Sequence, residues 1–126
     1  MIAGEYNMTI EQGSTFTRLI SIEEPDLIAD PNGSIFVPYL LVLHTARMQI
    51  RRTIESSTVM ISLTTENGGI DINPGTPENE ILLSISAANT ATLTSSGVYD
   101  LEIISNTGAI SKVIRGTITL IPEVTR

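Results

Sequence analysis

The sequence contains no cysteine and no tryptophan, and aromatic residues make up only 4% of its 126 residues. The lack of cysteine excludes disulfides, thiolate nucleophiles and cysteine-ligated zinc or iron–sulfur centres. Positive charge is also scarce, with 7 Lys and Arg residues against 14 Asp and Glu residues and a formal net charge of -7. Because such a chain is repelled by polyanions, we expect neither nucleic acid nor an anionic lipid surface as a partner.

Long hydrophobic runs are missing as well. The longest, Tyr39–Leu43, is far shorter than the roughly 20 residues needed to span a membrane. The segment Met1–Glu5 has neither the basic region nor the apolar stretch of a signal peptide, so no membrane association is expected. Hydrophobic residues still make up 41% of the sequence, which suffices for one packed domain over residues 1–126.

What the sequence does contain is a large excess of β-branched residues. Ile, Val and Thr account for 41 of the 126 residues, and their side chains favour strands over helices. Alternation of apolar and polar residues predicts strands, because successive strand side chains point to opposite faces. Strands are predicted over residues 6–11, 15–23, 45–53, 59–64, 70–72, 80–86, 98–105 and 109–121. One short helical turn is predicted over Ser86–Leu93, with Ser86 as its N-cap.

Turn residues separate these segments at intervals of roughly 8 to 12 residues, which is typical of a β-sandwich. No helical segment is long enough to connect parallel strands, so we predict an all-β, antiparallel sandwich of seven or eight strands. Asn106–Gly108 predicts a hairpin between the last two strands. Asp26–Tyr39 is irregular and is interpreted as a long loop or a hairpin excursion, the place best suited to a specialised function.

No set of residues indicates catalysis. His44 is the only histidine, and without cysteine it completes no nucleophilic triad, so we interpret it as a hydrogen-bonded residue at a strand entrance rather than a catalytic or ligating one. Glu78 and Glu80 would share one face of a strand, as paired carboxylates do, but solvated charges at a sheet edge explain them better. We expect a protein that is not an enzyme and that has no catalytic residues.

Cofactor sites are not indicated either. Asp26, Asp30 and Asn32 offer oxygen ligands but lack the spacing and the terminal glutamate of a calcium loop. Gly68–Gly69 and Gly97 lack the sequence context of a phosphate-binding loop and are explained by turns. We therefore predict no metal and no cofactor.

Two groups of residues are candidates for contact with a partner. The first is a basic face formed by Arg47, Arg51 and Arg52, with Arg18 as a further candidate; too few aromatic residues accompany it for base stacking, so a protein partner or solvent fits better. The second is the run Tyr39–Leu43, which is either a strand buried on both faces or an exposed patch. Tyr39, Leu40 and Leu41 are its candidate contact residues.

The segment Ser95–Leu101 resembles the corner found in immunoglobulin-like domains, where a small residue and then a tyrosine precede a late strand of the sandwich. The resemblance implies that Gly97 and Tyr99 form this corner and that the tyrosine hydroxyl hydrogen-bonds back across it. Leu101 stands where antibody domains have a cysteine, and tryptophan is absent. The resemblance therefore implies an immunoglobulin-like sandwich outside the antibody family.

A second resemblance covers most of the chain and consists of several blocks in order. The blocks are Thr9–Phe16, Thr45–Arg51, Leu63–Ile70, Gly97–Glu102, Arg115–Leu120 and Pro122–Arg126. Together they resemble a family of small tailed-phage virion proteins and the immunoglobulin-like N-terminal domain of phage baseplate upper proteins. Asp26–Leu43 departs from this pattern because it is longer and more apolar than a short turn.

This resemblance implies a structural protein of the virion, assembled in the host cytoplasm, with no catalytic residues. It would join tail, baseplate or fibre-attachment parts, in multiple copies, through contacts with other virion proteins at its sheet edges, loops and termini. Two alternatives stay open. A capsid decoration protein would need a similar sequence, whereas a carbohydrate-binding module is disfavoured because such sites stack sugars on aromatic side chains.

Overall fold

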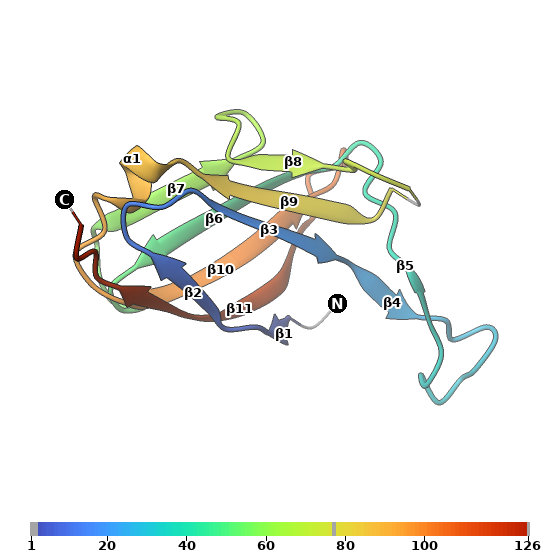
Figure 1. Cartoon of the computed structure of the whole chain (residues 1–126). Helices are drawn as coiled ribbons and strands as arrows, with labels where there is room; N and C mark the ends of the chain where they lie inside the picture. Colours follow the sequence, from blue (N-terminus) through green and yellow to red (C-terminus); the bar gives the residue numbers. More distant parts are fainter. Residues whose placement is uncertain (1–2, 77, 126) are drawn as a thin grey trace.

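The computed structural model describes residues 3–76 and 78–125 and consists of two β-sheets packed face to face and a small third sheet of two strands (Figure 1). Arg126, the last residue of the final resemblance block, lies outside these ranges. Eleven strands and one short helix occur within the described ranges: β1 (Gly4–Glu5), β2 (Met8–Glu11), β3 (Phe16–Ser21), β4 (Glu23–Pro25), β5 (Phe36–Pro38), β6 (Thr45–Arg51), β7 (Val59–Thr64), β8 (Ile70–Ile72), β9 (Glu80–Ile85), α1 (Ala87–Thr90), β10 (Gly97–Ile104) and β11 (Ile110–Ile121).

The order of the strands is that of an immunoglobulin-like sandwich. The larger sheet has the order β1-β11-β10-β6-β7, with β2 also paired to β11, and the smaller sheet has the order β3-β9-β8. In immunoglobulin nomenclature, β11, β10, β6 and β7 correspond to strands G, F, C and C′, and β3, β9 and β8 correspond to B, E and D. The predicted all-β sandwich is confirmed, and so is the hairpin between β10 and β11.

One edge of the larger sheet departs from the antiparallel arrangement predicted for the sandwich. β1 and β2 run parallel to β11, with Gly4 opposite Ile114 and Met8 opposite Ile118. Parallel neighbours need a long connection, which is usually a helix. Here the connection between the parallel strands β2 and β11 is formed by all the elements from β3 to β10, which lie between them in the sequence.

Eleven strands are present instead of seven or eight because short strands were not separated in the sequence. The predicted strand 6–11 is preceded by the two-residue β1, and the predicted strand 15–23 is divided into β3 and β4. The third additional strand, β5, lies within the irregular stretch 26–39. Alternation cannot identify strands of two or three residues, because a pattern of period two needs about four residues to be recognised.

The core lies between the two sheets and is built from the inward-facing residue of each alternating pair. Burial of each such Ile or Leu side chain contributes about 1.5–3 kcal/mol relative to exposure. The largest fully buried side chains are those of Ile10, Leu41, Met48, Ile50, Ile81, Leu83, Ile85, Leu93, Leu101, Ile103, Ile118 and Thr90.

The helical turn α1 forms as the sequence predicted. The Ser86 side chain accepts a hydrogen bond from the backbone N–H of Asn89 at 3.1 Å, which satisfies one of the free donors at the helix start. No helix in the described part of the chain is long and apolar enough to cross a membrane.

Gly116 lets the N-terminal segment approach β11 closely. Between β1 and β2, the backbone N–H of Tyr6 donates to the Arg115 carbonyl at 2.9 Å, and the Asn7 amide oxygen accepts from the Thr117 N–H at 3.0 Å. A Cβ at Gly116 would collide with the Tyr6 carbonyl oxygen and lie 2.7 Å from the Asn7 amide oxygen. Only glycine therefore fits at this position without moving the N-terminal segment.

Gly116→Ala should lower the free energy of unfolding by about 1–3 kcal/mol, the usual cost of inserting a methyl group into a packed site. Gly4→Ala is the matched control, because its Cβ would meet nothing closer than 3.8 Å in the same pair of strands. Urea denaturation of both variants measures the difference. Equal midpoints for the two variants would contradict the proposed role of Gly116.

Candidate functional site

The most distinctive feature of the surface is a hairpin that extends beyond one end of the sandwich (Figure 1). We call Glu23–Pro38 the arm. Its strands β4 and β5 pair antiparallel, with Glu23 opposite Pro38 and Pro25 opposite Phe36, and they form a separate two-stranded sheet. The irregular stretch predicted over Asp26–Tyr39 is therefore mostly a hairpin excursion from the sandwich.

Hydrogen bonds within the loop hold the tip of the arm. Asp26 Oδ1 accepts from the backbone N–H groups of residues 28 and 29 at 3.2 and 3.1 Å. The Asp30 carboxylate accepts from the N–H groups of Asn32 and Ser34, both at 3.0 Å, and from the Ser34 hydroxyl. The hydrogen bond from the Ser34 hydroxyl has the largest effect in lowering the pKa of Asp30, and the two backbone hydrogen bonds lower the pKa further. The carboxylates weighed as calcium ligands thus bind their own loop, and no three acidic or histidine side chains gather as metal ligands in the described residues.

The arm and the segment after it expose an unusual number of apolar side chains. Of the thirteen large hydrophobic residues that are exposed in the described ranges, seven lie within residues 27–43, and Ile28 is 98% exposed. Clusters of exposed apolar side chains are typical of surfaces that contact other molecules. The seven residues are Leu27, Ile28, Ile35, Phe36, Leu40, Val42 and Leu43.

The base of the arm corrects the interpretation of the run Tyr39–Leu43. The run is not a strand, and its residues alternate between core and surface. Leu41 is fully buried and belongs to the core, so it is not a contact residue, whereas Leu40 is exposed and Tyr39 is partly buried against the core. The ring of His44 is held locally, with Nδ1 2.8 Å from the Val42 carbonyl and Nε2 3.4 Å from the Tyr39 hydroxyl.

A buried asparagine that the sequence did not reveal fixes the position of the arm. The Asn79 side-chain amide donates to the Ile22 carbonyl at 2.9 Å, and the Leu41 N–H donates to the Glu78 carbonyl at 3.0 Å. Glu78 itself lies before β9 with a positive φ of 71°, so the paired-carboxylate alternative, in which it would share a strand face with Glu80, does not apply. An isolated Asn between two glutamates has no periodic signal, which is why only the structure identifies it.

A second candidate surface lies on the outward face of the larger sheet. Strand register places oppositely charged residues side by side across β11, β10 and β6. One row reads Lys112–Glu102–Arg47, and the row beside it includes Arg115–Asp100. We call the seven charged residues here the charged face: Glu5, Arg47, Arg51, Asp100, Glu102, Lys112 and Arg115.

Glu102 is the centre of the charged face. Its side chain is only 13% exposed, and it accepts hydrogen bonds from Arg47 Nε and, at 2.9 Å, from Lys112 Nζ, which also lies 3.1 Å from Asp100. Burial alone would raise the pKa of Glu102, but the hydrogen bonds and positive charges of Lys112 and Arg47 outweigh burial and lower it. The hydrogen bond to Glu102 raises the pKa of Lys112 in turn.

The charged face is concave and borders an open hollow of about 870 Å³, to which Ile54 and Val98 add apolar surface. Four of the seven Lys and Arg residues in the sequence line this hollow, together with three acidic residues. The hollow therefore has one net positive charge on a chain whose net charge is -7.

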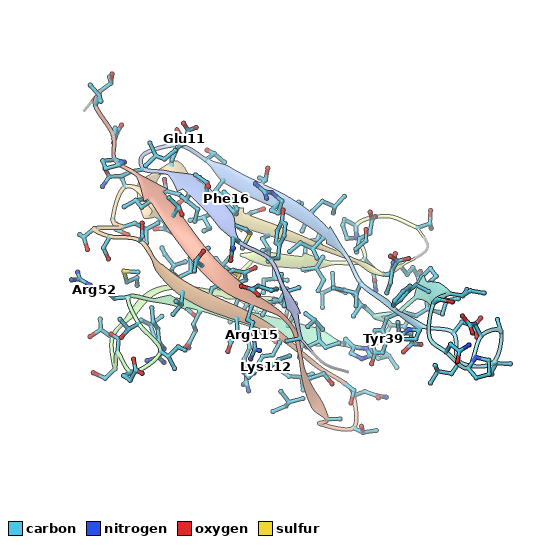
Figure 2. All side chains as sticks on the ribbon, turned by 90° about the horizontal axis from the view of Figure 1, so that it is seen from below. Glu11, Phe16, Tyr39, Arg52, Lys112 and Arg115 are labelled. Carbon is cyan, nitrogen blue, oxygen red and sulfur yellow. The ribbon has the colours of Figure 1, made fainter. Side chains whose placement is uncertain are left out.

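The predicted basic face is present only in part. Arg47 and Arg51 line the hollow, but Arg52 does not, and Figure 2 shows Arg52 and Tyr39 toward opposite ends of the sandwich. Arg18 is not near them, because it lies on the other sheet, 5.8 Å from the ring centre of Tyr6. The missing cations come from β11, where Figure 2 shows Lys112 and Arg115 close together. Sequence reasoning missed both because the pairing of distant strands is not encoded in either strand alone.

The immunoglobulin-like corner has a different hydrogen bond from the one implied by the resemblance. Tyr99 is 4% exposed, and its hydroxyl donates to the carbonyl of Tyr6, in the N-terminal segment, rather than to the corner itself. Burial first, and then the nearby Tyr6, raises the pKa of Tyr99 to about 12. At Gly97, a Cβ would collide with the Arg51 carbonyl, so glycine is required where the two strands approach.

Comparison with known proteins adds nothing to this geometry. The chain matches no model of a known protein family, and no curated protein sequence is significantly similar to it. The arm and the charged face are therefore the observations on which a functional argument can be built.

Tyr99→Phe should lower the free energy of unfolding by about 1–2 kcal/mol, because the Tyr6 carbonyl loses its buried donor. The wild-type protein should also lose stability as pH rises from 10 toward 12, because the unfolded tyrosine ionises near 10.0 and the folded one only near 12. The Tyr99→Phe variant should lose less stability than the wild type over this pH range, because it lacks the hydroxyl that ionises. Urea denaturation at pH 7, 10 and 12 measures both effects, with Tyr39→Phe as control; identical pH profiles for Tyr99→Phe and wild type would contradict the assignment.

Glu102→Gln should cost about 0.5–1 kcal/mol at pH 7, the range of a partly exposed ion pair. Because folding lowers the pKa of Glu102, its carboxylate stabilises the fold at pH values above 4.5, the ordinary pKa. This stabilisation is lost as the pH falls through the pKa of the folded state. The difference between variant and wild type should therefore shrink below pH 4. Glu66→Gln, at an exposed turn, is the matched control, and a Glu102 effect that stays constant down to pH 2 would refute the ion-pair explanation.

Proposed function

We propose that this protein is a non-enzymatic structural component of a tailed-phage virion that joins tail, baseplate or fibre-attachment parts through protein contacts. The single observation that carries the contact role is the arm, which holds exposed apolar side chains on a hairpin outside the sandwich. The virion part of the proposal rests on the ordered sequence blocks that resemble small tail proteins.

The architecture supports a joining role. A packed two-sheet core gives a rigid body, and the arm and the charged face lie on different parts of that body, so the protein can contact two neighbours at once. Partners would be other virion proteins, present in multiple copies. Repetition of modest contacts in one particle gives a durable assembly through avidity.

The aromatic residues favour a protein partner over a sugar. Phe16 and Tyr99 are buried in the core, and Tyr6, which is 37% exposed, has the Arg18 guanidinium 5.8 Å from its ring centre. Phe36, on the arm, is the aromatic residue with the largest exposed fraction, 55%. A sugar platform needs flat aromatic faces in a site, whereas a single exposed Phe among aliphatic residues suits a protein contact.

The test is the copy number of this protein in purified virions of the phage that encodes it. Quantitative mass spectrometry, with the major capsid and tail-tube proteins as internal references, should give tens of copies or fewer. A count that equals the capsid protein would replace the tail assignment with capsid decoration. Absence from the particle would overturn both.

A further inference from the structure

We propose that the arm of one copy of this chain docks into the hollow of the charged face on a second copy, so that copies associate head to tail. The contact would join two different surfaces of the same molecule. This inference concerns the chain itself and does not depend on its being a virion protein.

Charge complementarity is the first observation behind the proposal. The arm contains Glu23, Glu24, Asp26 and Asp30 and no Lys or Arg, so it has four negative charges and no positive one. The charged face gathers four of the chain's seven cations. Complementary charge steers association and sets the orientation of a complex.

Two of these cations are available for a partner. Among the described residues, Arg51 donates only to uncharged groups, the Ser56 carbonyl at 2.7 Å and the Gln49 amide oxygen at 2.8 Å. Arg115 lies between Asp100 and Glu5 in the strand register, yet it forms no ion pair with either, or with any other residue of the described ranges. Arg47 and Lys112, in contrast, are already neutralised by Glu102 and Asp100. An incoming carboxylate would therefore meet Arg51 and Arg115.

Apolar contacts would add to the charge pairing. Ile28 and its neighbour Leu27 project from the tip of the arm, 98% and 60% exposed. The hollow offers Ile54, itself 82% exposed, and Val98 beside the arginines. A volume of about 870 Å³ lies within the usual range of ligand sites, large enough for a few side chains of a hairpin tip.

The geometry within one copy leaves both surfaces free. The arm extends past the end of the sandwich (Figure 1), and no arm residue is among those that line the hollow of its own chain. The Asp26 and Asp30 hydrogen bonds order the tip before any contact forms, which lowers the entropy lost on binding. Because each copy has one arm and one hollow, the contact is heterologous and produces rings or open filaments.

The experiment is sedimentation velocity on the full chain over a range of protein and salt concentrations. The wild-type protein should associate with increasing concentration and dissociate as salt rises, because screening weakens exposed charge pairs. Glu24→Arg and Arg115→Glu should each weaken association at least tenfold, since either places like charges together. The double variant Glu24→Arg/Arg115→Glu should recover most of the lost affinity, because the pair of charges is exchanged.

Matched controls separate this contact from a general effect of charge. Glu66→Arg changes the net charge as Glu24→Arg does but lies at a turn outside the arm, and Arg52→Glu lies outside the hollow. Both controls should associate like wild type. A further variant, Ile28→Ser, alters one fully exposed side chain, so it should fold with an unchanged thermal midpoint and still associate about tenfold more weakly.

Three results would overturn the inference. The wild-type protein could stay monomeric up to about 1 mM, or the arm and face variants could associate as strongly as the wild type. The third is that both single variants are impaired but the double variant does not recover affinity. Each of these leaves the virion proposal standing. Absence of the protein from virions, conversely, would not affect self-association in solution.

Discussion

The alternation of side chains along β10 determines both the core and the charged face. Leu101 and Ile103 point inward and are almost fully buried, while Glu102 points outward between its cations. A shift of one residue would bury carboxylates and expose leucine, so the register of this central strand is strongly fixed. The bulge between Leu101 and Glu102 skips Val113 in β11 and brings Lys112 opposite Glu102. One irregularity in pairing thus creates the Lys112–Glu102 ion pair, whereas Arg47 lies opposite Glu102 in the regular register of β6 and β10.

Much of this fold can be predicted from the sequence because the long strands alternate clearly. The strand 59–64 has the predicted bounds, and the strand 45–53 is correct to within two residues, since apolar and polar residues alternate without interruption in both. Pairing is a different matter. Alternation shows which face a residue occupies but not which strand lies beside it, so the parallel contact of β2 with β11 and the bond from Tyr99 to Tyr6 could only be learned from the structure.

The candidate site was less predictable for the same reason. Hydropathy marked Tyr39–Leu43 as apolar but could not separate the buried Leu41 from the exposed Leu40. The irregular segment was identified, yet its function as an arm depends on the pairing of β4 with β5 and on the anchoring of its base by Asn79. The charged face combines residues from three strands that are distant in sequence, and Arg47 and Arg51 were its only members that a single strand could reveal.

The parallel edge also affects how the chain is made. The hydrogen bond between Thr117 and Asn7 joins residues 110 positions apart, and β2 pairs with the end of β11 beside it. At ribosomal rates of roughly 5–20 residues per second, β2 waits on the order of ten seconds for its partner to emerge. β2 can pair with β11 only after almost all the other strand pairs of the sandwich can form. Closure of the sandwich is therefore a late event in synthesis, and β2 is an unpaired strand in the nascent chain until then.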